Sequence, residues 1–131
     1  MLASRAMLRV ALACAAIVLT ASSASAVNLT GTWTCFGRDA NVDTATYNIR
    51  QVGNELFWLG QKDPQAPGRD WANVAHGRYN PAGNAFDMSW ADIRGPFGNA
   101  GTIIVRYSYQ GRDILEVVGN PGAFGTRRCV R

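Results

Sequence analysis

The sequence predicts an all-β fold, an eight-stranded antiparallel up-and-down β-barrel that follows an N-terminal signal peptide. Three observations support this prediction. Beyond residue 26 no stretch keeps a 3.6-residue helical period, whereas short runs rich in β-branched and aromatic residues recur. Most runs are joined by short turn-forming segments, and one cysteine lies near each end of this region. A chain of 131 residues with 47% hydrophobic and 17% charged residues also suits one globular domain rather than a disordered tail.

The first 26 residues have the layout of a secretory signal peptide. Arg5 and Arg9 give a positive start, an apolar segment covers residues 10–19, and Ala24-Ser25-Ala26 has the small-residue form that signal peptidase cuts. The apolar segment is shorter than the roughly 20 residues that a membrane-spanning helix needs. We therefore expect cleavage after Ala26 and export to the periplasm or the extracellular space. The remaining residues, 27–131, would form a single barrel domain that is not membrane-anchored once mature.

The sequence gives little support for a lipid anchor or for a nucleic-acid partner. A lipid anchor on Cys14 is disfavoured because Ala11-Leu12-Ala13 is a poor lipobox and apolar sequence continues beyond the cysteine. Nucleic acid is disfavoured because Arg5 and Arg9 leave with the signal peptide, which lowers the net charge of +4. No basic cluster longer than Arg127-Arg128 then remains to neutralise phosphates.

Eight strands are predicted from the recurring apolar and aromatic runs. They cover residues 30–36, 45–52, 55–60, 72–79, 85–93, 101–109, 113–118 and 123–130. The long connections are 37–44 and 61–71. Short connections between successive strands produce an antiparallel meander, and closing the meander into a barrel removes the exposed edges of an open sheet.

Cys35 and Cys129 predict how the barrel closes. They are the two cysteines that remain after cleavage, and in an exported protein such a pair favours a disulfide. The bond requires the first and last strands to be neighbours and, in the chain-entropy model, stabilises the fold by about 4–5 kcal/mol. The alternatives are two free thiols or a redox pair, which the lack of C-x-x-C spacing disfavours.

The turn at Gly53-Asn54 predicts the register of one hairpin. A two-residue turn pairs Val52 with Glu55 and Ile49 with Trp58. One face of the hairpin then collects its large apolar side chains and is expected to face the lumen of the barrel. The residues of this face are Tyr47, Ile49, Gln51, Leu56 and Trp58.

The segment Asn80-Pro81-Ala82-Gly83 predicts a second hairpin. A type I turn with the last of these residues in the left-handed conformation pairs His76 with Met88 and Val74 with Trp90. Because the aromatic face belongs inside, the predicted lumen-facing residues are Val74, His76, Phe86, Met88 and Trp90. The predicted outward-facing residues are Asn73, Ala75, Gly77, Asp87, Ser89 and Ala91.

A third register is predicted between the sixth and seventh strands. Pairing Val105 with Val117 matches apolar residues and sets Arg106 opposite Glu116, a favourable cross-strand charge pair. The sequence leaves open whether Arg106 and Glu116 face inward or outward. On the outer face the pair would contribute little stability.

Two motifs resemble the calycin barrels, a group that includes the avidins and the lipocalins. Leu29-Thr30-Gly31-Thr32-Trp33 resembles their opening G-x-W strand, and Phe86-Asp87-Met88-Ser89-Trp90 is similar to the aromatic strand that lines the avidin ligand site. The resemblance implies a barrel whose floor is closed by Trp33 under a cation from the last strand, which would be Arg127, Arg128 or Arg131. Cys35 stands where avidins carry an Asn that contacts biotin, so biotin is not expected as the ligand.

Most of the region after residue 26 is also similar to a group of small exported bacterial proteins. The similar segments are residues 49–58, 72–77, 90–92 and 122–125.

Together these features predict a non-enzymatic exported barrel that binds a small, partly apolar ligand of unknown identity in its lumen. The expected ligand-binding residues are Tyr47, Gln51, Trp58, His76, Phe86 and Trp90. Ordinary core packing of the two tryptophans is the competing interpretation. The alternative function is an exported protein-binding module, such as a protease inhibitor, that acts through loops 61–71 and 94–99.

An enzyme is not expected, because no acid–base pair or activated nucleophile emerges from the sequence. His76 is the one histidine; in the predicted register Asp87 points to the opposite face, and only Asp92 shares its side. One histidine and two remaining cysteines leave little for a zinc site, and no phosphate-binding loop is found. The sequence therefore predicts no metal and no cofactor.

Overall fold

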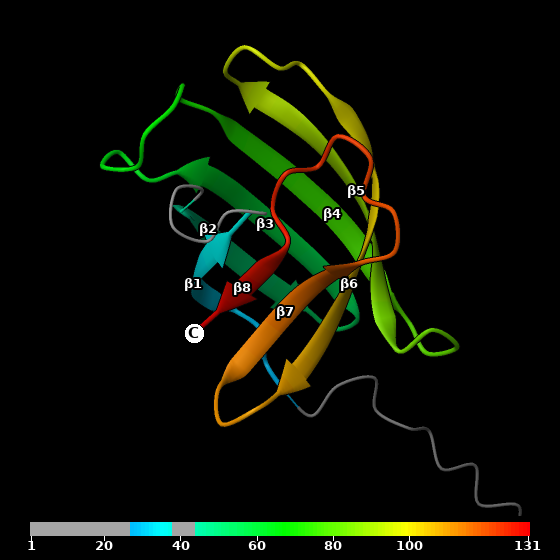
Figure 1. Cartoon of the computed structure of the whole chain (residues 1–131). Helices are drawn as coiled ribbons and strands as arrows, with labels where there is room; N and C mark the ends of the chain where they lie inside the picture. Colours follow the sequence, from blue (N-terminus) through cyan, green and yellow to red (C-terminus); the bar gives the residue numbers. More distant parts are fainter. Residues whose placement is uncertain (1–26, 38–43) are drawn as a thin grey trace, which may run out of the picture.

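The computed structural model describes residues 27–37 and 44–131, and these residues form the predicted closed barrel. Eight antiparallel strands follow one another around the barrel in chain order, and β1 pairs with β8 to close it (Figure 1). The strands are β1 (Gly31–Phe36), β2 (Thr44–Val52), β3 (Glu55–Lys62), β4 (Ala72–Asn80), β5 (Ala85–Arg94), β6 (Ala100–Tyr109), β7 (Asp113–Val118) and β8 (Arg128–Val130). The predicted signal peptide, residues 1–26, lies outside the described residues.

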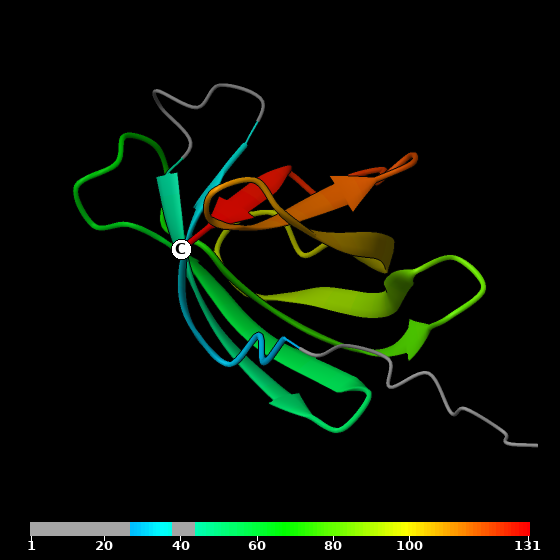
Figure 2. The same ribbon diagram turned by 90° about the horizontal axis from the view of Figure 1, so that it is seen from below.

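The connections gather at the two opposite ends of the barrel. The tight β2–β3, β4–β5 and β6–β7 turns lie at one end, which we call the floor (Figures 1 and 2). The longer β3–β4 and β5–β6 connections and the segment 119–127 lie at the other end, which we call the mouth. In the part of the chain that the structure describes, no helix is long and apolar enough to cross a membrane.

The disulfide between Cys35 and Cys129 joins the first strand to the last, as predicted. The two cysteines are directly paired residues of β1 and β8, and both are buried. The prediction of a strand over 123–130 is wrong for residues 123–127, because β8 contains only Arg128–Val130. The preceding segment turns at Pro121, whose carbonyl oxygen accepts a hydrogen bond from the Phe124 amide at 3.1 Å, and then directs Phe124 into the barrel.

The register of the β2–β3 hairpin is the predicted one. Val52 pairs with Glu55 and Ile49 with Trp58 across the turn at Gly53, which has a φ of 58°. This left-handed conformation favours glycine in a two-residue turn. The predicted lumen-facing set is buried apart from Gln51, which is half-buried at the floor.

The predicted register of the β4–β5 hairpin is wrong by one residue. The turn contains the four residues 81–84, so Asn80 pairs with Ala85 and Ala75 with Trp90. The left-handed position belongs to Asn84, with a φ of 47°, and not to the preceding glycine. Because side chains alternate between the two faces, a slip of one residue turns the whole of β4 over. Its inward residues are Asn73, Ala75 and Gly77, and its outward residues include Val74 and His76.

Packing explains why the small residues of β4 face inward. A Cβ atom at Gly77 would lie 2.6 Å from Met88 Sδ and would collide with the carbonyl oxygen of Asp87. Gly60 on β3 likewise leaves the space that the ring of Tyr47 occupies. The narrow interior of an eight-stranded barrel therefore holds its large side chains opposite glycines and alanines.

The β6–β7 pairing matches the sequence prediction, with Val105 opposite Val117 and Arg106 opposite Glu116. Val105 is buried whereas Arg106 is exposed, so the charged pair lies on the outer face. Arg106 also donates a hydrogen bond to the carbonyl oxygen of Gly83 at 3.4 Å. The alternation of buried and exposed residues along β6 thus decides what the sequence left open, namely on which face Arg106 and Glu116 lie.

Trp33 and Arg131 close the floor. The Trp33 side chain is fully buried, and its indole N–H donates to the carbonyl oxygen of Leu29 at 2.9 Å. The guanidinium of Arg131 lies 4.6 Å from the centre of the Trp33 ring, a cation–π contact. Arg131 also bonds Asp113 Oδ2 and the Thr30 carbonyl oxygen, each at 2.8 Å. The last residue of the chain thus holds the N-terminal segment against the end of the barrel.

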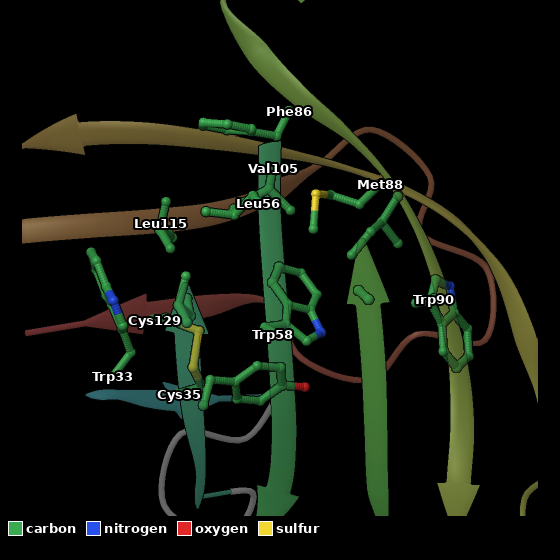
Figure 3. Packing of buried hydrophobic residues seen from close by; sticks show 14 of the residues in the cluster. Trp33, Cys35, Leu56, Trp58, Phe86, Met88, Trp90, Val105, Leu115 and Cys129 are labelled. Carbon is green, nitrogen blue, oxygen red and sulfur yellow. A yellow bond between two sulfur atoms is a disulfide. The ribbon is translucent and has the colours of Figure 1, made fainter. Parts of the chain in front are cut away.

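The half of the lumen next to the floor, which we call the lower half, is filled by side chains. Figure 3 shows Leu56, Phe86, Met88, Val105 and Leu115 pointing into the interior together with the disulfide and the tryptophans. Trp33 and Leu56 have no exposed surface, and Phe86 and Met88 are each 2% exposed. A ligand therefore finds no free space in this half of the barrel.

Loss of the disulfide is expected to destabilise the barrel strongly. The bond closes a loop with a sequence separation of 94 residues, for which the chain-entropy model gives about 4–5 kcal/mol. Urea unfolding of the oxidised protein, of the reduced protein and of a Cys35→Ala/Cys129→Ala variant measures this difference. A change below about 1 kcal/mol would contradict the closure by β1 and β8.

Replacing Gly77 by alanine tests the observed β4 register. Its Cβ would collide with Asp87 and Met88, so Gly77→Ala should lower the free energy of unfolding by about 1–3 kcal/mol. Gly83→Ala is the matched control, because its Cβ meets nothing closer than 3.9 Å. Equal stability of the two variants in urea unfolding would favour the register in which Gly77 faces solvent.

Candidate functional site

A cavity of about 330 Å³ lies at the mouth of the barrel. Its aromatic lining comes from four separate segments and consists of Trp71, Trp90, Phe97 and Phe124. Its polar and charged lining includes Lys62, Asn73, Asp92, Asn99 and Thr126. A mostly apolar hollow with a few convergent polar groups is typical of a site for a small molecule.

Phe124 separates this mouth cavity from the filled lower half of the lumen. It comes from the segment 119–127, yet it is 1% exposed because its ring enters the barrel. The ring stacks at 5.9 Å from the centre of Trp58 and packs edge-to-face at 5.0 Å from Trp90. One face of the cavity is thus built by the segment that leads into β8.

A chain of hydrogen bonds between buried side chains forms the base of the cavity. Trp58 Nε1 donates to Asn73 Oδ1 at 3.3 Å, and Asn73 Nδ2 donates to Tyr47 Oη at 3.2 Å. Tyr47 Oη in turn lies 2.8 Å from Thr126 Oγ1. Asn73 and Thr126 are the buried polar residues of the described chain, with 5% and 7% exposure. We call these four residues the polar chain.

Burial has a strong effect on Tyr47. Desolvation raises the pKa of its phenol to about 12, the hydrogen bonds with Thr126 and Asn73 oppose the shift, and the negative charge of Asp92 adds to it. The phenol is therefore protonated at neutral pH and can donate a hydrogen bond. Its ring also packs edge-to-face on Trp58 at 5.4 Å.

Trp90 contributes its ring to the cavity wall, but its indole N–H is unsatisfied. Nε1 is buried and has no hydrogen-bond partner among the described residues. A Cβ at Gly101 would lie 3.2 Å from this nitrogen, so Gly101 leaves room for the indole beside β6. An unpaired buried donor costs about 1–3 kcal/mol, which a better-packed residue would avoid.

Polar contacts hold the rim of the cavity in place. Asp92 Oδ2 accepts a hydrogen bond from the Asn99 amide at 2.9 Å, which fixes the ends of the β5–β6 loop. The ammonium of Lys62 donates to the carbonyl oxygens of Asp63 and Ala66 in the β3–β4 loop, at 3.0 and 2.5 Å. The charges of Asp92 and Lys62 are therefore both partly neutralised by backbone dipoles.

The structure places three of the six predicted ligand-binding residues at or beneath the cavity and the other three elsewhere. Tyr47, Trp58 and Trp90 lie together at the cavity or directly beneath it. Phe86 lies in the filled half and packs on Tyr79 at 5.4 Å. Gln51 lies at the floor, where its Oε1 accepts a hydrogen bond from the Leu29 amide at 2.9 Å. Gln51 thus holds the N-terminal segment at the end opposite to the cavity.

The predicted inward orientation of His76 is wrong. Because β4 is turned over, His76 lies on the outer face, where it stacks on Phe57 at 4.4 Å and approaches Glu55 at 3.6 Å. Asp92 lines the cavity on the inner side of the sheet. His76 and Asp92 therefore cannot act on one substrate group.

Sequence reasoning missed Trp71, Asn73, Phe124 and Thr126. Asn73 was assigned to the outer face through the incorrect hairpin register, and Trp71 stands one residue before its strand. Phe124 and Thr126 were placed in the part of the predicted strand 123–130 that the structure does not form. The signal that could have found them is the turn formed by Pro121 and Gly122, which ends the alternation of a strand.

Metal binding finds no support in the described residues. Residues 27–37 and 44–131 contain no group of three or more His, Cys, Asp or Glu side chains that could hold an ion. No protein-family model, no curated protein and no solved structure matches the chain.

The raised pKa of Tyr47 predicts a loss of stability at high pH. Between pH 10 and 12 the unfolded chain releases the phenol proton while the folded chain keeps it. Stability is therefore full below pH 10 and falls by up to about 3 kcal/mol as the pH rises towards 12. Urea unfolding across this range should show a smaller decline for Tyr47→Phe than for the original protein. Tyr109→Phe, at a position 68% exposed, is the control and should keep the full decline.

Proposed function

We propose that this chain is an exported, non-enzymatic barrel of the calycin type that binds a small, partly apolar ligand in the mouth cavity. The observation that supports the proposal most strongly is the cavity itself, about 330 Å³ in volume and lined by four aromatic residues over a buried polar chain. The closed barrel and Trp33 beneath Arg131 support the calycin-like part of the proposal. The disulfide and the signal-like first 26 residues support export.

Binding rather than catalysis is proposed because of the groups that surround the cavity. They are mainly indole and phenyl rings, amides, two hydroxyls and the ammonium of Lys62, which hold and orient a molecule without accepting a proton from it. Asp92 is the carboxylate of the lining, and one of its oxygens already accepts the Asn99 amide. The single histidine of the chain is on the outer face. A general acid–base pair is therefore not part of the proposal.

Variants of the aromatic wall test the proposed site. Native mass spectrometry of the purified protein with extracted cell-envelope metabolites would identify a bound molecule, and its affinity would follow from quenching of tryptophan fluorescence. Trp71→Ala and Trp90→Ala should each weaken binding at least tenfold, because each removes a ring that lines the cavity. His76→Ala on the outer face is the control and should leave the affinity unchanged. Equal affinities of all these variants would place the ligand elsewhere.

A protein-binding module is the second candidate, and one observation favours it. The β3–β4 loop is joined to the start of the β5–β6 connection by an ion pair in which Nε of Arg94, the last residue of β5, lies 2.8 Å from Asp70 Oδ2. Beside this pair, Ile93 and Phe97 are 58% and 59% exposed. Two linked loops with exposed apolar side chains resemble a small contact patch. If Ile93→Ser abolishes binding of a protein partner while Trp71→Ala does not, the loop surface and not the cavity is the binding surface.

A further inference from the structure

The polar chain has a direction that follows from the chemistry of its first member. The indole of Trp58 can only donate, so the atom of Asn73 that faces it is the amide oxygen. The other atom of the amide, Nδ2, therefore faces Tyr47 and donates to its phenol oxygen. Hydrogen atoms thus point along the chain from Trp58 towards Tyr47.

The same direction continues to Thr126. The hydroxyls of Tyr47 and Thr126 share one hydrogen bond, so one of their two hydrogen atoms is left over. If Thr126 were the donor, the leftover hydrogen would belong to Tyr47, which is buried and does not line the cavity. Donation by Tyr47 avoids that buried unsatisfied hydrogen and leaves the extra hydrogen on Thr126 Oγ1. Thr126 lines the cavity, and no described residue accepts this hydrogen.

Each bond in such a chain polarises the next, which makes the last hydroxyl a better donor than an isolated one. Asn73 Nδ2 also carries a second hydrogen atom, and Asn73 lines the same cavity. The base of the cavity consequently offers hydrogen-bond donors that lack acceptors among the described residues. A molecule that fills the cavity leaves these donors unsatisfied unless it brings an acceptor.

The charges around the cavity indicate what kind of acceptor fits. Asp92 brings a negative charge to the lining, and that charge reaches far enough to raise the pKa of Tyr47. The ammonium of Lys62 is directed at the carbonyl oxygens of Asp63 and Ala66. Among the described residues of the lining, Lys62 is the cation and is already engaged with these carbonyls, so a carboxylate at the base would meet the negative charge of Asp92, whereas a neutral oxygen would not be repelled.

We infer that the ligand carries an uncharged acceptor oxygen, such as a ketone, ester or amide carbonyl, that accepts a hydrogen bond from Thr126 Oγ1. Its apolar part packs against Trp71 and Trp90. The inference rests on the proposed function and names the chemical class of the molecule bound at that site. It also assigns Thr126, which lies in the segment leading to β8, as the residue that selects the ligand.

Matched probes test this inference without knowledge of the natural ligand. Ethylbenzene is acetophenone without the carbonyl oxygen and so has no acceptor, and benzoate replaces the neutral acceptor by an anion. Isothermal titration calorimetry should show acetophenone binding about fivefold more tightly than either of the others, the gain expected from one hydrogen bond. The indole N–H signals in an NMR titration show whether each probe reaches the aromatic wall.

Substitutions at Thr126 locate the effect. Thr126→Val keeps the shape without the hydroxyl and should abolish the preference for acetophenone, whereas Thr126→Ser should keep it. Thr102→Val, at an exposed position on β6, is the control and should behave like the original protein. Near-ultraviolet circular dichroism checks that each variant is folded. If Thr126→Val does not fold, the comparison of the three probes on the original protein still tests the inference.

The outcomes separate this inference from the proposed function. Equal binding of acetophenone and ethylbenzene would overturn the inference and leave an apolar binding site in place. Tighter binding of benzoate would overturn the assignment of a neutral oxygen. A preference that persists in Thr126→Val would overturn the role of Thr126. If no probe shifts the indole signals, the proposed function fails together with the inference.

Discussion

The pairing of β1 with β8 is the constraint on which the rest of the structure depends. β8 contains only the three residues Arg128–Val130, so few backbone pairs join it to β1. The disulfide between Cys35 and Cys129 links the two strands at paired positions. Because β7 ends at Val118 at the mouth, the chain must travel through residues 119–127 before it can re-enter the sheet there. Closure therefore places this segment across the mouth, and Phe124 and Thr126 enter the barrel as a consequence.

The volumes of the inward side chains then decide which part of the barrel interior is filled. Eight strands enclose a space that side chains can nearly fill, so large residues on one strand require small residues beside them. Gly60 gives its space to Tyr47, and Gly77 gives its space to Met88. With the floor sealed by Trp33, this packing leaves a cavity of about 330 Å³ at the mouth, next to the core. A binding site in this barrel is therefore the part of the core that the chain's own side chains do not fill.

The sequence was sufficient for the barrel, the closing disulfide and two of three predicted registers, and insufficient for the site. The turn at Gly53 has one favourable geometry, so its hairpin could be derived from local chemistry alone. The turn before Ala85 admits two registers, and the prediction put the left-handed residue at Gly83, whereas in the structure it is Asn84. The deciding term was steric fit to Asp87 and to Met88, the residue paired with Gly77 on β5, because a Cβ atom at Gly77 would collide with both. Asn73 was missed through the same hairpin register, whereas Phe124 was missed because its burial depends on Trp58 and Trp90, which are distant in the chain.

The polar chain connects stability to recognition. Buried polar groups are tolerated when they satisfy one another, and Asn73 and Tyr47 do so at the boundary between the packed core and the open mouth. Because the series starts at an indole that cannot accept, one hydroxyl hydrogen is left over at its other end, which reaches the cavity at Thr126. The core residues that exclude water from the lower half thus also determine the polarity of the surface offered to a ligand. A change that merely repacks this boundary would alter selectivity and stability together, whereas a change in the outer loops would leave the direction of the hydrogen bonds intact.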